Sequence, residues 1–162
     1  MSQTAASTTE VTRILDQLHR ACEGPAWHGT ALREILAGVT YQAAAKRPIP
    51  GAHTIWEIVL HVTVWMSVAT ARIHGADRRE LTPEQDWPTP PAPSESAWRE
   101  ALERLAEAQQ TLESTIRTLD DGRLSDEVEG DVRQSVYTLL HGVVQHNLYH
   151  GGQIALLKKA VA

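Results

Sequence analysis

Residues 139–157 read LLHGVVQHNLYHGGQIALL, and this stretch decides the expected fold. Its apolar positions, together with two histidines, are Leu139, Val143, His146, His150, Ile154 and Leu157. They recur every three or four residues, which puts them on one face of an α-helix. His146 and His150 are four residues apart, so their Cβ atoms are expected to lie about 5–6 Å from each other. The stretch predicts a long helix, from about Ser135 to Ala160, that carries two neighbouring imidazoles into a protein core.

The same helical spacing of apolar residues predicts three more long helices and no strand. They cover about residues 9–22, 54–74 and 94–119. Thr54 and Glu57 are spaced to form a capping box at the second of these helices, and Ser94 can cap the third. Two short helices are expected between the first two long ones, at 30–36, where Thr30 is the expected cap, and at 41–46.

The linker between the second and third long helices, residues 76–93, holds five of the eight prolines. Its length and composition predict a loop that crosses the bundle, and the polar residues 120–131 predict a second loop. The chain has no internal repeat and no second composition block. Residues 1–162 therefore predict a single all-α domain, a four-helix bundle with a long crossover loop.

Composition argues against several classes of protein. The formal net charge is −5 and the 15 basic residues are scattered, which argues against nucleic-acid binding. The longest apolar stretch, residues 58–66, is too short to span a membrane. The N-terminus lacks the basic start and apolar region of a secretory signal, and Cys22 is the single cysteine. We therefore expect a cytoplasmic protein without disulfides or a cysteine-based metal cluster.

A third histidine, His61, is expected to face the same core from the second long helix, where it shares a face with Ile58, Trp65 and Val68. A histidine on an apolar face is usually a core residue whose nitrogens find hydrogen bonds. Three unpaired imidazoles in one core would each lose free energy, however, whereas a single ion satisfies all three. We therefore predict that one divalent metal is bound by His61, His146 and His150.

Glu57 and two loop histidines are weaker candidates for roles at this site. Glu57 lies one turn before His61, so it could orient that ligand or act as a base on bound water. The capping box explains Glu57 as well, and we favour that interpretation. His28 and His53 lie in loops near helix starts, where either could line the mouth of a pocket, but we do not expect them to bind the metal.

Two stretches, residues 50–65 and 145–154, closely resemble the DinB/YfiT-like superfamily, as do residues 27–29, the loop at 86–88 and Trp98. The resemblance implies a four-helix bundle that binds a metal, often nickel or zinc. Its ligands are one histidine of the second helix and two of the last, at the positions of His61, His146 and His150 here. Many relatives have another histidine where this chain has Tyr149, a difference that leaves the three ligands intact.

Three protein nitrogens without a visible fourth ligand are typical of catalytic metal sites. The resemblance implies two chemistries for such a site: metal-dependent hydrolysis, and reactions that use low-molecular-weight thiols such as mycothiol or bacillithiol. We therefore expect a metalloenzyme acting on a small molecule, and we rank a thiol-dependent S-transferase above a hydrolase. The alternative is a stress-associated metal-binding protein without catalysis. The resemblance also favours a homodimer.

Overall fold

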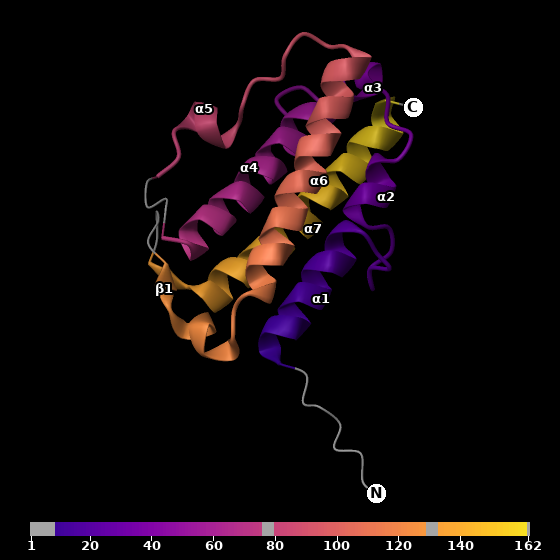
Figure 1. Cartoon of the computed structure of the whole chain (residues 1–162). Helices are drawn as coiled ribbons and strands as arrows, with labels where there is room; N and C mark the ends of the chain where they lie inside the picture. Colours follow the sequence, from indigo (N-terminus) through magenta and orange to yellow (C-terminus); the bar gives the residue numbers. More distant parts are fainter. Residues whose placement is uncertain (1–8, 76–79, 129–132, 162) are drawn as a thin grey trace, which may run out of the picture.

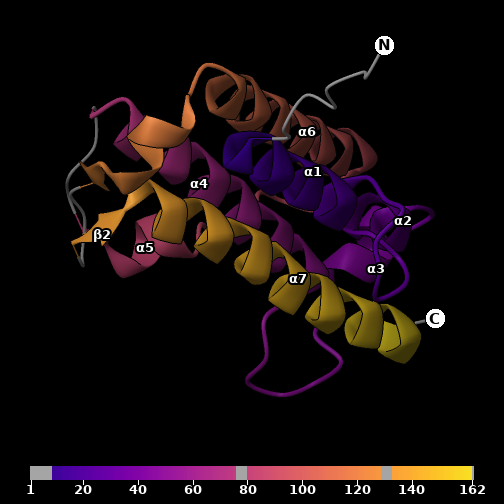
Figure 2. The same cartoon turned by 90° about the horizontal axis from the view of Figure 1, so that it is seen from below.

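Four long helices lie side by side in the structure, a computed structural model that describes residues 9–75, 80–128 and 133–161 (Figures 1 and 2). They are α1 (Glu10–Cys22), α4 (Ile55–Ile73), α6 (Glu95–Arg117) and α7 (Val136–Val161). Helices α1 and α4 each pack against both α6 and α7. This arrangement confirms the predicted all-α four-helix bundle.

Shorter elements join the long helices. They are α2 (Leu32–Leu36), α3 (Tyr41–Ala45), α5 (Pro83–Asp86), the 3-10 helix η1 (Asp121–Ser125), and strands β1 (Glu127–Val128) and β2 (Gln134–Ser135). Helix α5, the 3-10 helix η1 and the two short antiparallel strands were not predicted, because each is too short to leave a periodic pattern in the sequence. Parts of both predicted loops, residues 76–79 and 129–132, lie outside the described residues.

The helix starts show why these segments fold where they do. At α4 the capping box forms as predicted: the Thr54 hydroxyl accepts the Glu57 N–H at 3.1 Å, and the Glu57 carboxylate accepts the Thr54 N–H at 2.6 Å. Ser94 caps α6 through the N–H of Ala97. The predicted short helix α2 is present and ends at Leu36, but its predicted cap was wrong, because the N-cap is Ala31 rather than Thr30.

The core lies between the four long helices and is closed by the segment that carries α2 and α3. Its largest fully buried side chains include Trp56, Ile58, Met66, Leu112, Leu140 and Ile154. Trp98 of α6 is also buried, and its indole N–H donates to the carbonyl of Val39 at 2.8 Å, which ties α6 to the residues just before α3. Among the described residues, every helix is too short or too polar to cross a membrane.

The connection from α4 to α6 matters most for the site. Helix α4 ends at the left of the view in Figure 1, at about mid-height, and α6 begins near the top, so the connecting chain runs back along the bundle. On this path α5 packs against α4. The crossover therefore places Asp86 and Trp87, at the end of α5, beside the middle of α4.

Candidate metal centre

The structure brings together the three histidines that were predicted as metal ligands. His61 comes from α4, and His146 and His150 come from successive turns of α7. One ring nitrogen of each lies within 4.8 Å of the others, and the Nε2 atoms of His61 and His146 are 2.9 Å apart. His61 and His150 are buried, each about 5% exposed, whereas His146 is partly exposed.

Hydrogen bonds to the far side of two rings fix which nitrogen faces the centre. His61 Nδ1 lies 2.8 Å from the carbonyl oxygen of Asp86, and His150 Nδ1 lies 2.7 Å from Oε1 of Gln153. Each of these oxygens needs a donor, so Nδ1 carries the hydrogen in both rings. The Nε2 atom of a neutral ring then presents a lone pair to the centre, the form in which imidazole binds a metal.

His146 differs from the other two on its far side. Its Nδ1 atom is buried and has no hydrogen-bond partner among the described residues, and neither has the side-chain oxygen of the next residue, Asn147. The amide nitrogen of Asn147 donates to Sγ of Cys22 at 3.5 Å. The polar contacts of the His146 ring are therefore concentrated at Nε2, which faces His61.

Burial favours the neutral form of all three rings. It lowers the pKa of His61 and of His150, although hydrogen bonds to Asp86 and Gln153 oppose the shift. Burial, followed by the positive charge of the two neighbouring imidazoles, lowers the pKa of His146 to about 4. At neutral pH the rings are therefore uncharged, and no proton has to be displaced when a metal binds.

The arrangement fits a small divalent ion. Two imidazole nitrogens that share an ion at about 2.0–2.1 Å lie about 3–4 Å apart, close to the separations found here. Neutral imidazole donors suit zinc, nickel, copper and iron. Among the described residues, these three histidines are the single group of three or more His, Cys, Asp or Glu side chains that meet in this way.

Trp87 covers the centre from the end of α5. Its indole stacks on the ring of His61, with centroids 3.8 Å apart and planes 3° from parallel. The other stacking partner of Trp87 is His53, at 3.4 Å and 4°. Since Asp86 Oδ1 accepts the indole N–H of Trp65 at 2.7 Å, the end of α5 is held at two points beside His61. The sequence alone marked these loop residues through the family resemblance and did not assign them a role.

Glu57 acts as a cap and as an anchor for neighbouring side chains. One carboxylate oxygen accepts the Thr54 N–H, and the other pairs with Arg47 at 2.7 Å. His53 Nδ1 lies 3.6 Å from the same carboxylate. Burial would raise the pKa of Glu57, but these hydrogen bonds and the Arg47 charge outweigh it and lower that pKa. The contacts support the capping interpretation over a direct role beside His61.

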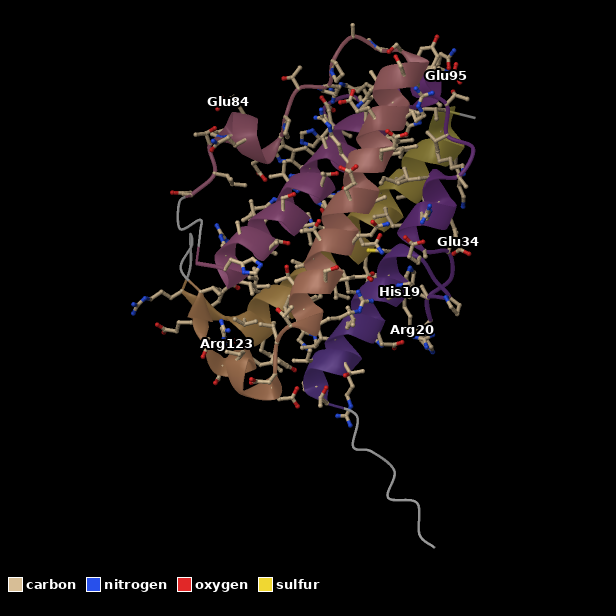
Figure 3. All side chains as sticks on the ribbon, in the orientation of Figure 1. His19, Arg20, Glu34, Glu84, Glu95 and Arg123 are labelled. Carbon is tan, nitrogen blue, oxygen red and sulfur yellow. The ribbon has the colours of Figure 1, made fainter. Side chains whose placement is uncertain are left out.

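Other candidate groups lie elsewhere. His28 is exposed and lines a shallow cleft with Trp27 and Leu148. His19 lies on the α1 side of the molecule, away from Glu84 of α5 (Figure 3). A larger cleft of about 850 Å³ lies between α6 and the segment carrying α2 and α3, and it contains none of the three clustered histidines. The residues with metal-binding chemistry and these two clefts are therefore separate features.

Comparison with known proteins identifies the family. The sequence profile of the DinB superfamily matches residues 26–154, a range that includes α4, α5, and the part of α7 that carries His146 and His150. A search of curated proteins and a search of solved structures gave no match. The matched range covers well over half of the sequence. The chain therefore belongs to the DinB superfamily.

Proposed function

We propose that the protein binds one divalent transition metal, zinc or nickel, through His61, His146 and His150, and uses it as a metalloenzyme on a small molecule. The observation that carries the proposal is the 2.9 Å approach of two Nε2 atoms, those of His61 and His146. The hydrogen bond at its Nδ1 leaves His61 with a lone pair at this contact. An ion between the rings satisfies all three nitrogens at once.

A hydrogen bond between two neutral rings is the competing explanation for this short contact. A neutral His146 ring that carries its hydrogen on Nε2 could donate it to the lone pair on Nε2 of His61. The pKa of His146, lowered to about 4, disfavours only a second proton on that ring at neutral pH. Such a bond joins two nitrogens and does not include His150, whereas a metal ion can bind all three.

The donor set favours a catalytic over a structural centre. No carboxylate or cysteine joins the histidine cluster among the described residues, so the protein would supply three neutral ligands. An ion held in this way keeps its full positive charge and acts as a Lewis acid toward an anionic ligand. His146 is the partly exposed member of the cluster, and its edge is where a small molecule could approach.

We rank a thiol-dependent S-transferase first and a metal-dependent hydrolase second. Zinc and nickel accept sulfur as well as nitrogen ligands, and three neutral nitrogens leave the preference for an anionic sulfur undiminished. The alternative, a metal-binding protein without catalysis, predicts a centre that is closed to further ligands.

Cobalt substitution tests these proposals. The cobalt-loaded protein should develop a sulfur-to-metal charge-transfer band when 2-mercaptoethanol is added, because a thiolate would enter the coordination sphere. His61→Ala, treated in the same way, should give little or no band. His28→Gln, which alters an exposed histidine outside the cluster, is the matched control and should behave like the unaltered protein. A spectrum that does not respond to thiol, azide or pH would leave only the non-catalytic alternative.

A further inference from the structure

His53 occupies a defined position although it precedes the first turn of α4. Its ring stacks on one face of Trp87, and its Nδ1 atom lies 3.6 Å from a carboxylate oxygen of Glu57. The side chain is nevertheless 44% exposed. An exposed histidine in a loop normally has many rotamers available, so two contacts of this kind restrict where its remaining nitrogen can point.

The stack places His53 next to the metal centre. Trp87 stacks on His53 and on His61, and both pairs of planes lie within 4° of parallel. His53 is thus two ring spacings from a proposed metal ligand, at the exposed end of a stack whose other end is buried. Its charge also contributes to lowering the pKa of His61 and of His150, as expected if His53 lies near both rings.

The Glu57 carboxylate lies within ion-pair distance of His53, 3.6 Å from its Nδ1 atom, and can orient the ring. The carboxylate is held by the Thr54 N–H and by Arg47, and these contacts lower its pKa, so it is ionised at neutral pH. An ionised carboxylate beside Nδ1 favours the tautomer with hydrogen on that atom and leaves a lone pair on Nε2. A carboxylate that orients an imidazole in this way is the arrangement that many enzymes use to accept a proton.

We propose that His53 is a catalytic base of the centre, which takes the proton from a thiol substrate. In this step the S–H bond breaks, its electron pair stays on sulfur, and the proton goes to Nε2 of His53. The products are a thiolate and an imidazolium whose charge Glu57 balances. The proposal rests on the proposed thiol-dependent function, and it transfers the role of base from Glu57, where the sequence suggested it, to the histidine that Glu57 orients.

The test compares His53→Gln with His28→Gln in the full-length, cobalt-loaded protein. Glutamine keeps a flat polar side chain against Trp87 but cannot accept a proton. With 2-mercaptoethanol at pH 7, His53→Gln should slow the appearance of the charge-transfer band by at least about tenfold, since general bases typically contribute 10²–10⁴-fold. His28→Gln should leave the rate unchanged. Glu57→Gln retains an oxygen for the Thr54 N–H and removes the charge, so its rate should fall between the two.

Cobalt content and circular dichroism of each variant accompany the rate measurements. Equal rates in His53→Gln and the unaltered protein would overturn the role of His53 while leaving the proposed function intact. No band in the unaltered protein would instead reject the thiol-dependent function itself. Loss of cobalt from His53→Gln would mean that the side chain supports the stack rather than accepts a proton, and that result would also overturn the inference.

Discussion

Two clusters of polar side chains lie inside this bundle, and they are completed in different ways. On α6, the buried carboxylate of Glu113 accepts from Gln109 at 2.9 Å and from Arg117 at 3.2 Å, and His19 of α1 lies 3.4 Å away. In this cluster the negative charge of the carboxylate is met by a guanidinium and by an amide donor of the protein itself. In the histidine cluster of α4 and α7, three nitrogens approach one another, and the described residues place no carboxylate among them; the Asp86 carboxylate lies behind His61, 3.1 Å from its Nδ1 atom.

The difference shows how a structural polar cluster can be distinguished from a binding site. A buried carboxylate that already has three partners gains nothing from an added ion. A cluster of imidazole nitrogens with no carboxylate at its centre can instead offer its lone pairs to a cation. Both clusters contain histidine on an amphipathic helix, so residue type alone does not separate them. The two clusters are distinguished by whether their neighbouring donors and acceptors complement one another.

The largest expected effect is the loss of metal from the histidine cluster. Protein purified without a tag should contain about one divalent ion per chain, because three imidazoles suffice for one tight site. Elemental analysis of His146→Ala and of His150→Ala should find little metal in either. Glu113→Ala alters the self-contained cluster and should retain the full content. Unchanged metal in both histidine variants would exclude this site assignment.

The second-largest expected effect is a loss of folding stability at acid pH, caused by the histidine cluster. In the metal-free protein the pKa of His146 is about 4, against about 6.5 in an unfolded chain, so the folded state binds fewer protons. The neutral His146 ring makes its full contribution to folding stability above about pH 6.5. This contribution, about 2 to 3 kcal/mol, is lost as the pH falls toward 4. Urea unfolding at pH 7 and pH 4.5 measures this change. A weaker pH dependence is expected for His146→Gln; an identical one would contradict the assignment to His146.

The metal occupancy of the loaded protein should also fall as the pH is lowered. Protons compete with the ion for the imidazoles, so occupancy should be full at neutral pH and fall as the pH drops through roughly 6 to 5. Dialysis at a series of pH values, followed by metal analysis, tests this expectation. Full occupancy at pH 4 would point to carboxylate ligands instead of histidines.

The self-contained cluster should affect stability without affecting metal binding. Glu113→Ala removes the shared acceptor of Gln109 and Arg117 and leaves the buried amide with an unsatisfied donor. We expect the free energy of unfolding to fall by about 2 kcal/mol. Calorimetry of the metal-free protein gives the change, and competition with a chelator should give an unaltered metal affinity. A parallel loss of affinity would show that the two clusters are coupled.

The smallest expected effect concerns the support of one ligand. Gln153→Ala removes the acceptor for His150 Nδ1 and leaves the ring free to rotate. Loss of such a partner typically weakens metal binding by 10–100-fold, and we expect about tenfold here because the other two ligands are unchanged. Chelator competition measures the affinity. Gln145→Ala, on an exposed position of the same helix, serves as the control.

Much of the candidate metal centre follows from local sequence. The spacing of His146 and His150 fixes their relation because both lie on one helix, and the capping box at Thr54 sets where α4 begins and so how His61 faces inward. Local rules failed at α2, where Glu34 accepts the N–H of Ala31 at 2.7 Å and takes the place of a side-chain cap. An acidic residue inside the helix can thus replace the hydroxyl that Thr30 was expected to supply.

The surroundings of the centre could not be predicted in the same way. His61 meets Asp86 across 25 positions of sequence, and Trp87 meets His53 across a comparable distance. These contacts depend on how a proline-rich crossover settles against α4, which no periodic pattern encodes. The histidines could be found from helical geometry, whereas their supporting residues required the path of the loop.

The stacked position of Trp87 also has an optical consequence. Indole emission is quenched by a protonated imidazole lying against its face, and heavier or paramagnetic ions quench it further at short range. Trp56 and Trp98 are shielded in the core and Trp27 is fully exposed, so these three are not expected to respond to the centre in this way. The ring of Trp65 lies 5.9 Å from that of His146 and 6.4 Å from that of His61, so its emission should respond as well and must be separated from that of Trp87. The part of the emission that is lost in Trp87→Phe should therefore report binding of the proposed metal at His61. Between two of its histidines the protein carries a fluorophore by which this proposal can be followed without a label.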